Sequence, residues 1–240
     1  GQQQQQHIAP MDGETYRSFV QRAHNALLHV MPDPETRNAA VWEAWESVHG
    51  NPLRDHAAAQ FNQEEFTTVP NVCYFFEHQT KARDGTPLNY GFKELADIAD
   101  ANNARLDTGA YSAIASHHTQ DGVAGPKHEP ATIGYAGPYS IGMVGRQNPK
   151  WAIFADEHRD KGYADTFAGR RRRSVEVMRF RDGRPSYLDP IATLGANSPR
   201  LALPLARYED SNAEVERYSF VPDAMMTAAS GSNTYTKGFG

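Results

Sequence analysis

The chain has 240 residues, a formal net charge of −5 and a single cysteine. Hydrophobic residues make up 39% and charged residues 22%, which is the balance of a folded chain, and the length suits one domain with a small appendage. The lone cysteine excludes an intramolecular disulfide, the absence of a long apolar run argues against a membrane span, and the negative charge argues against nucleic acid as a partner.

The first fifty residues predict a leader and two helices. Gln2–Gln6 form a polar tract without the apolar segment of a secretory signal, so we expect a disordered leader over residues 1–10. Apolar residues then recur at helical spacing from Tyr16 onward, and Asp33-Pro34 can cap and start a second helix that ends at Gly50. Residues 11–50 are therefore predicted to be a helical hairpin.

The rest of the chain changes to a β pattern. Residues 51–68 are polar and mixed and predict a linker, and residues 211–240 predict a polar, mobile tail. Between them, residues 69–210 carry short β-favouring runs separated by turns, which favours an α+β fold built on a compact, mainly antiparallel barrel or sandwich. Strands are expected at 72–77, 111–118, 131–135, 139–144, 151–156, 174–180 and 187–193, and helices at 92–99 and 161–168.

A pair of histidines stands at the end of one predicted strand. His117 and His118 are adjacent, and because side chains alternate along a strand only one of them can face a given site. Histidine titrates near neutral pH and can act as a general base toward a serine. The alternative is a pair of polar histidines with no chemical role.

A serine follows the run Arg170–Arg173 and begins the predicted strand. Ser174 and Glu176 would share one face of that strand. A serine hydroxyl becomes a good nucleophile when a base accepts its proton and a third group orients the base. Asp189 is a candidate orienting group and Glu176 is its competitor, whereas the alternative for Ser174 is a purely structural strand residue.

The arginine run admits three interpretations. It is a solvated charged face, a docking site for acidic partners, or a source of positive charge near a developing oxyanion. The run alone would also support a nucleic-acid-binding virion protein, against the overall charge.

Other chemistries have weaker support. Motifs for zinc proteases, paired-cysteine sites and phosphate-binding loops are absent from the sequence, so we expect no cofactor. Asp156, Glu157 and His158 could hold a metal together with His118, but such mixed clusters arise by chance. Cys73 fits a half-buried strand residue better than a nucleophile.

From about residue 90 to 204, the order of several short motifs resembles the prohead (capsid maturation) proteases of Mu-type and related tailed phages, which are related to the herpesvirus assemblins. The motifs are His118-Thr119, Ile133-Gly134-Tyr135-Ala136-Gly137, Ala152-Ile153-Phe154-Ala155-Asp156, Tyr163-Ala164-Asp165, Arg172-Arg173-Ser174-Val175-Glu176, Asp189-Pro190-Ile191-Ala192 and Ser198-Pro199.

The resemblance implies an assemblin-like β-barrel and a serine endopeptidase that cuts scaffold and major capsid proteins inside the immature shell, in the host cytoplasm. It implies Ser174 as nucleophile and His118 as base. Assemblins use a second histidine as the third member, and since no histidine follows Ser174 here, Asp189 or Glu176 would replace it. The sequence leaves open whether the chain forms a homo-oligomer. The alternative is a non-catalytic capsid-associated or scaffold-linked assembly protein that keeps the protease-like domain.

Overall fold

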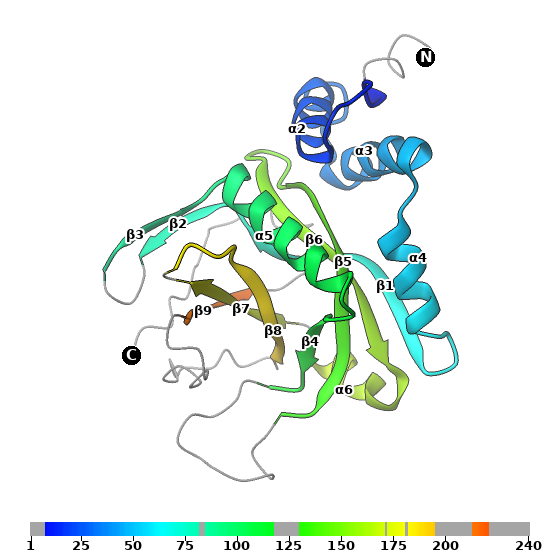
Figure 1. Cartoon of the computed structure of the whole chain (residues 1–240), viewed down its shortest axis with the longest axis vertical. Coiled ribbons are helices and arrows are strands. Elements are labelled where there is room, and N and C mark those ends of the chain that lie inside the picture. The colour runs from blue at the N-terminus through cyan, green and yellow to red at the C-terminus, as the bar shows by residue number, and fades with distance from the viewer. Residues whose placement is uncertain are drawn as a thin grey trace.

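A computed structural model describes residues 8–81, 85–117, 130–170, 172–180, 182–194 and 213–220 (Figure 1). The helices in these ranges are α2 (Tyr16–Leu27), α3 (Pro34–His49), α4 (Pro52–Gln60), α5 (Phe92–Leu106) and α6 (Ala164–Gly169), with the short 3-10 turn η1 (Lys161–Tyr163) before α6. The strands are β1 (Phe66–Phe76), β2 (His78–Lys81), β3 (Pro87–Tyr90), β4 (Ser112–Ala115), β5 (Thr132–Val144), β6 (Lys150–Asp160), β7 (Arg172–Phe180), β8 (Tyr187–Leu194) and β9 (Ala213–Phe220).

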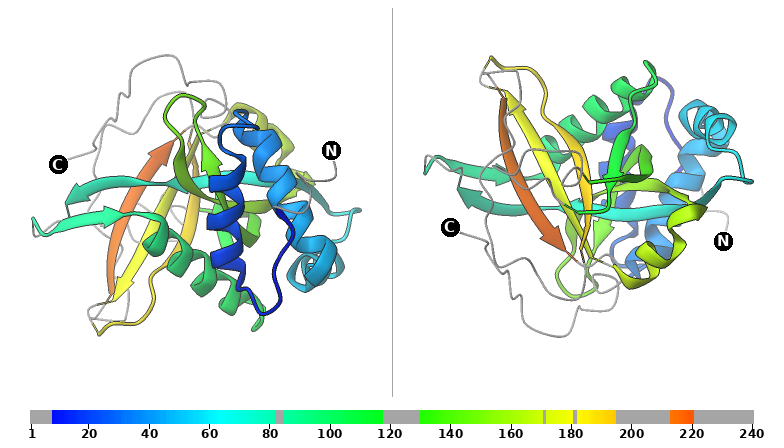
Figure 2. Two further views of the ribbon diagram at one scale, coloured as in Figure 1. Left: turned by 90° about the horizontal axis from the view of Figure 1, so that it is seen from above. Right: turned by 90° about the horizontal axis from the view of Figure 1, so that it is seen from below.

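One mixed sheet forms the centre of the fold. Its strand order is β1-β6-β5-β4-β8-β7-β9, with β2 and β3 as a separate hairpin. The pairs within the main sheet are antiparallel except for β4 and β8, which run parallel. Figure 2 shows the β7–β9 end of the sheet turned steeply against the long strands β1 and β6. The mixed helix and sheet class is confirmed, whereas the sheet is open in the described ranges and does not show the closed barrel.

The two predicted N-terminal helices are present, and α3 has the predicted ends. Asp33 caps α3, because its Oδ2 accepts the backbone N–H of Thr36 at 3.0 Å, and Pro34 occupies the first turn. Gly50 ends the helix with a φ of 68°, and its N–H donates to the carbonyl of Glu46 at 2.8 Å. Helices α2 and α3 contact each other and both contact β5, so the pair is attached to the main sheet.

The linker predicted for residues 51–68 is wrong in its secondary structure. Asn51 accepts the N–H of Arg54 at 3.0 Å and starts α4, and β1 begins at Phe66. Only Ala57 of α4 is buried, which explains why this helix reads as a polar linker in the sequence. Phe61, the first residue after α4, is buried and fixes the end of the helix against the sheet.

Two further expectations are corrected. The tail predicted for 211–240 includes β9, which pairs with β7 from Ala213 to Phe220; its other residues lie outside the described ranges. The two strands predicted at 131–135 and 139–144 are one strand, β5, whose pairing with β6 shifts register between Ala136 and Tyr139. Of the predicted leader, residues 8–10 are described and 1–7 are not.

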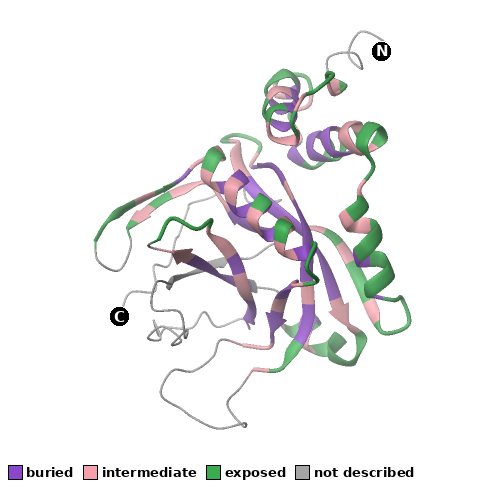
Figure 3. Cartoon of the chain, viewed as in Figure 1, coloured by how far each residue is buried: buried purple, intermediate pink, exposed green. Residues whose placement is uncertain are grey.

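Helix α5 is the main cover of the sheet, and it contacts β5, β6 and β8. Figure 3 shows buried positions along α5 and along the central strands that it covers. Asn102 of α5 binds both backbone groups of Leu188 in β8, with distances of 2.9 Å from Leu188 N and 3.0 Å to its carbonyl oxygen. Asn103 does the same for Tyr139 in β5 at 2.8 and 2.9 Å. These amides fix the helix against both strands.

None of the helices in the described part of the chain is long and apolar enough to cross a lipid bilayer.

Candidate functional site

Ser174 lies in the middle of a hydrogen-bonded ladder. It is the third residue of β7 and pairs with Ala192 of β8 on one side and with Ser219 of β9 on the other. Its exposed fraction is 0%. A buried hydroxyl on a strand that is paired on both sides is fixed in position, but a peptide would reach it only after the surrounding chain rearranges.

The register of the sheet connects Ser174 to the end of β4. Ala115, the last residue of β4, pairs with Ala192, which in turn pairs with Ser174. Side chains in one row of a sheet point to the same face, and two strand spacings separate the outer members by about 10 Å. The chain therefore leaves β4 toward His117 from the same row that holds Ser174.

The backbone before the histidines is held in place. The carbonyl of Ser116 accepts a hydrogen bond from Thr193 Oγ1 of β8 at 3.0 Å and another from Nη1 of Arg170. His117 is half-buried, and its Nδ1 is hydrogen-bonded to Ser116 Oγ at 2.9 Å. His118 lies outside the described residues, so its position relative to Ser174 is not part of this geometry.

Asp189 is bound by two other groups. One oxygen accepts from Arg105 of α5 at 2.7 Å, and the other accepts the N–H of Ala113 in β4 at 3.3 Å. Burial raises the pKa of Asp189, and the charge and hydrogen bond of Arg105 oppose that rise without cancelling it. Asp189 thus links β8 to α5 and β4. Its competitor Glu176 is buried on β7, with an exposed fraction of 2%.

The arginine run does not form one charged surface. Arg173 is buried, with Nη2 at 2.6 Å and Nε at 3.1 Å from the carboxylate of Glu157 in β6. Arg170 holds the Ser116 carbonyl. The interpretation of the run as a solvated face is wrong for Arg173, because a buried carboxylate on another strand compensates its charge. Arg171 and the side chain of Arg172 lie outside what the structure describes.

Glu157 is the centre of this buried network. Besides Arg173, it accepts from Arg159 Nε at 2.6 Å and from the hydroxyl of Tyr74 at 2.6 Å. Burial would raise the pKa of Glu157, but the charges and hydrogen bonds of Arg173, the charge of Arg159 and the Tyr74 hydrogen bond outweigh burial and lower it. The carboxylate stays ionised between two guanidinium groups.

The acidic and histidine run on β6 is divided between the two faces of the strand. Asp156 pairs with Arg54 of α4 at 2.9 Å, and His158 stacks on Phe61 with ring centroids 4.3 Å apart. Glu157 points to the opposite face, as alternation along a strand requires. These three residues therefore do not converge on one metal ion, and His118, the fourth member of the mixed cluster considered from the sequence, lies outside the described residues.

Comparison with models of protein families, with curated proteins and with solved structures gave no match. The site therefore rests on its own geometry. Sequence reasoning missed Tyr74 and Arg159 as partners of Glu157. Alternation along a strand that continues past residue 156 would have placed Glu157 and Arg159 on one face, whereas no local signal pointed to Tyr74, which lies on β1.

Proposed function

We propose that this chain is a serine endopeptidase that cleaves scaffold and major capsid proteins during maturation of a phage prohead. Ser174 is the nucleophile, His118 is the general base, and Asp189 orients the base. The observation that carries the proposal is the row formed by Ala115, Ala192 and Ser174, because it brings the strand that leads into the histidines within two strand spacings of the serine.

The mechanism follows from the roles of the two groups. His118 accepts the proton of the Ser174 hydroxyl as Oγ attacks a peptide carbonyl, and the protonated imidazole then donates that proton to the leaving amine. Water hydrolyses the resulting acyl-enzyme, with the imidazole again as base. The clamp on the Ser116 carbonyl by Thr193 and Arg170 supports this role, because it fixes the strand end from which the histidines extend.

The proposed fold is an assemblin-like barrel. The described sheet supports it in one respect, because β1 contacts β7 although the two strands do not pair, so the sheet curls toward closure. The proposed place of action is the interior of the assembling prohead in the host cytoplasm, with the scaffold and coat proteins as partners.

The experiment is co-expression of the chain with a phage scaffold or major capsid protein, read as cleavage on a gel and by mass spectrometry. Ser174→Ala abolishes cleavage while thermal unfolding and circular dichroism stay unchanged. His118→Ala has the same effect, and His117→Ala is the matched control that leaves cleavage intact. Cleavage that survives Ser174→Ala overturns the assignment of the nucleophile.

Two isosteric variants decide which carboxylate is the third member of the proposed catalytic triad. Asp189→Asn reduces cleavage if Asp189 orients the base, whereas Glu176→Gln reduces cleavage if the competitor does. Each variant is compared at equal folded fraction, because Glu176 lies on β7, the strand of Ser174, and Asp189 lies on β8, which pairs with it. A loss confined to Glu176→Gln moves the role from Asp189 to Glu176.

A second candidate is a non-catalytic assembly protein with a protease-like domain. Two observations favour it: Ser174 has no exposed surface, and the carboxylate of Asp189 is bound by Arg105 and Ala113. A fluorophosphonate probe separates the candidates, because it labels an activated serine covalently. Labelling of the wild-type chain that disappears in Ser174→Ala supports the protease, and equal absence of labelling in both supports the assembly protein.

A further inference from the structure

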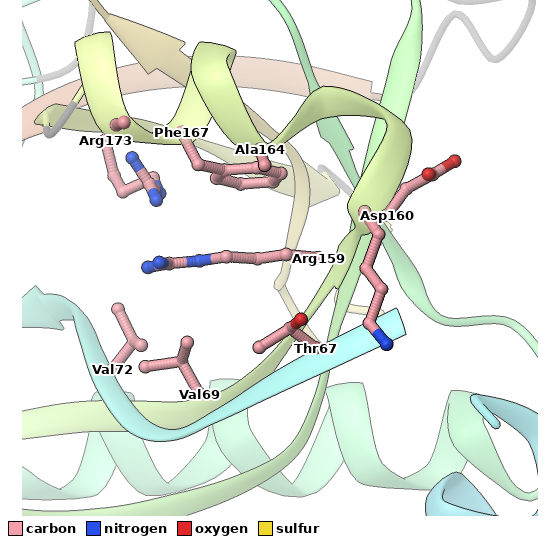
Figure 4. A pocket seen from close by; sticks show the side chains of 10 residues that line it. Thr67, Val69, Val72, Arg159, Asp160, Ala164, Phe167 and Arg173 are labelled. Carbon is pink, nitrogen blue, oxygen red and sulfur yellow. The ribbon is translucent and has the colours of Figure 1, made fainter. Parts of the chain in front are cut away.

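A cavity of about 540 Å³ opens between the first strand of the sheet and β7 (Figure 4). It lies where β1 approaches β7, so residues from both strands line it together with residues of β6, η1 and α6. The lining residues are Thr67, Val69, Val72, Arg159, Asp160, Lys161, Ala164, Phe167, Ala168 and Arg173. Ser174 is not among them, so this cavity is distinct from the position of the proposed nucleophile.

Strand alternation determines which side chains face this cavity. Thr67 pairs with Arg159 and Val69 pairs with Glu157 across β1 and β6, so these four side chains share one face. The intervening pair, Thr68 and His158, faces the other way and forms a hydrogen bond of 2.9 Å. Arg159 is thus directed into the cavity by the same alternation that buries Glu157.

Three cationic side chains, those of Arg159, Lys161 and Arg173, line the cavity. Two guanidinium groups, those of Arg159 and Arg173, share the single buried carboxylate of Glu157. Lys161 adds a further positive charge to the lining and Asp160 a negative one. An anionic group bound beside Arg159 would interact with its guanidinium in a partly water-excluded place, where the interaction is stronger than at an open surface.

Arg159 is the side chain that is free to bind an anionic group. Only its Nε is hydrogen-bonded, to Glu157, and within the described ranges its two terminal nitrogens have no acceptor. The guanidinium is held over the ring of Phe167 at 5.0 Å, and the side chain keeps an exposed fraction of 31%. Its geometry is therefore fixed in advance, with the terminal N–H groups that bind a carboxylate in a two-pronged manner available. Figure 4 shows Arg159 extending across the cavity below Arg173.

We propose that this cavity binds the acidic side chain, Glu or Asp, of an extended peptide. A peptide is favoured over a small acid because β1 is the terminal strand of the described sheet, and an extended segment can add to such an edge by backbone hydrogen bonds. The edge then supplies affinity, and Arg159 selects the carboxylate. The inference rests on the proposed function only for the source of the peptide, which would be an acidic segment of a scaffold or capsid substrate.

The test measures binding without cleavage. The full chain carrying Ser174→Ala is titrated against fluorescein-labelled peptides of alternating Ala and Thr with one central Glu, and against the same peptides with a central Gln, by fluorescence anisotropy. The Glu peptide is expected to bind at least about tenfold more tightly, since a carboxylate bound by a guanidinium is a charge-assisted pair. Equal binding of the two peptides overturns the inference.

Variants of Arg159 test whether this side chain causes the preference for Glu. Arg159→Met, made in the same background, reduces the preference for Glu to about twofold or less, and Arg159→Lys, which keeps the charge but not the two-pronged geometry, gives an intermediate preference. Arg146→Met is the matched control, because Arg146 pairs with Asp33 at the surface, and it keeps the full preference. A preference for Glu that persists in Arg159→Met overturns the role of Arg159.

The two proposals fail in different ways. If the wild-type chain cleaves no substrate but the preference for Glu is present and depends on Arg159, the peptide-binding proposal is supported and the protease proposal is wrong. If the wild-type chain cleaves its substrate and the two peptides bind equally, the protease proposal is supported and the peptide-binding proposal is wrong.

Discussion

Arg173 and Glu157 form a buried ion pair between β7 and β6, with 2.6 Å between Nη2 and Oε1 and side-chain exposures of 2% and 0%. The pair joins strands that are not neighbours in the sheet. Removing one partner of a buried pair leaves the other charge without compensation. The network therefore matters for stability as well as for the charge of the cavity beside it.

Arg173→Met is expected to lower the free energy of unfolding by about 3 to 5 kcal/mol, because Glu157 stays buried with Arg159 as its one remaining cation in the described part of the chain. Urea denaturation measures the change. Arg146→Met is the control: its ion pair with Asp33 is exposed, and its loss costs at most about 1 kcal/mol. The double variant with Glu157→Met should recover much of the loss, and equal, small losses in both single variants would contradict the buried pair's role.

Asn102→Leu is expected to lower the free energy of unfolding by about 1 to 3 kcal/mol, because the buried N–H of Leu188 loses its acceptor. The carbonyl of Leu188 keeps the hydroxyl of Ser112, at 2.6 Å, so one orphaned group and not two is created. Asn103→Leu is the comparison: Asn103 is half-buried, so water can replace its amide and the loss is smaller. Amide hydrogen exchange at Leu188 reports the change directly, and unchanged protection there would refute it.

Local signals in the sequence predicted the parts of the fold that depend on near neighbours. Asp33, Pro34 and Gly50 mark the ends of α3 because caps act within one turn. Helix α5 was predicted to stop at residue 99 but runs to Leu106. Asn102 and Asn103 are poor helix formers, and their place in the helix depends on strands far along the chain. That tertiary compensation is invisible in a single sequence.

The candidate site also has one part that the sequence predicted and one part that it did not. Alternation along the strand predicted at 174–180 assigns Ser174 and Glu176 to one face, as the β7 register shows, whereas Glu157 and Arg159 lie beyond the strand predicted at 151–156, because β6 continues to Asp160. The burial of Arg173 was not readable, because a run of arginines is usually solvated and its counter-charge lies on a strand that does not adjoin β7. Contacts between separated strands depend on how the sheet curls, and composition carries little information about that curl.

The stability of the chain should fall in acid because of His24. His24 is fully buried, and burial together with the nearby charge of Arg37 lowers its pKa from 6.5 to about 3. The unfolded chain therefore binds a proton below pH 6.5 that the folded chain rejects, so stability decreases as pH falls from about 6.5 toward 3, by up to about 1.4 kcal/mol per pH unit.

The variant His24→Phe isolates this effect, since the ring packs edge-on against Trp151 at 5.4 Å and an aromatic replacement keeps that contact. Urea denaturation of both proteins at pH 7, 6 and 5 gives the difference in unfolding free energy, from which the other titrating groups largely cancel. We expect the wild type to lose stability relative to the variant at each step below pH 6.5. Parallel curves would show that His24 titrates normally.

Cys73 should be chemically silent in the folded protein. It has an exposed fraction of 3%, and burial raises its pKa from 9.0 to about 12, which reduces the thiolate fraction near pH 8 about a thousandfold. Ellman's reagent is therefore expected to release almost no colour in native buffer and one equivalent in urea, since the chain has one cysteine. Under the proposed protease function, Cys73→Ala should cleave substrate at the wild-type rate. Rapid labelling of the native protein, together with loss of cleavage in Cys73→Ala, would contradict this prediction. The thiol would then replace Ser174 as the proposed nucleophile, because only an accessible thiolate attacks both the reagent and a peptide carbonyl.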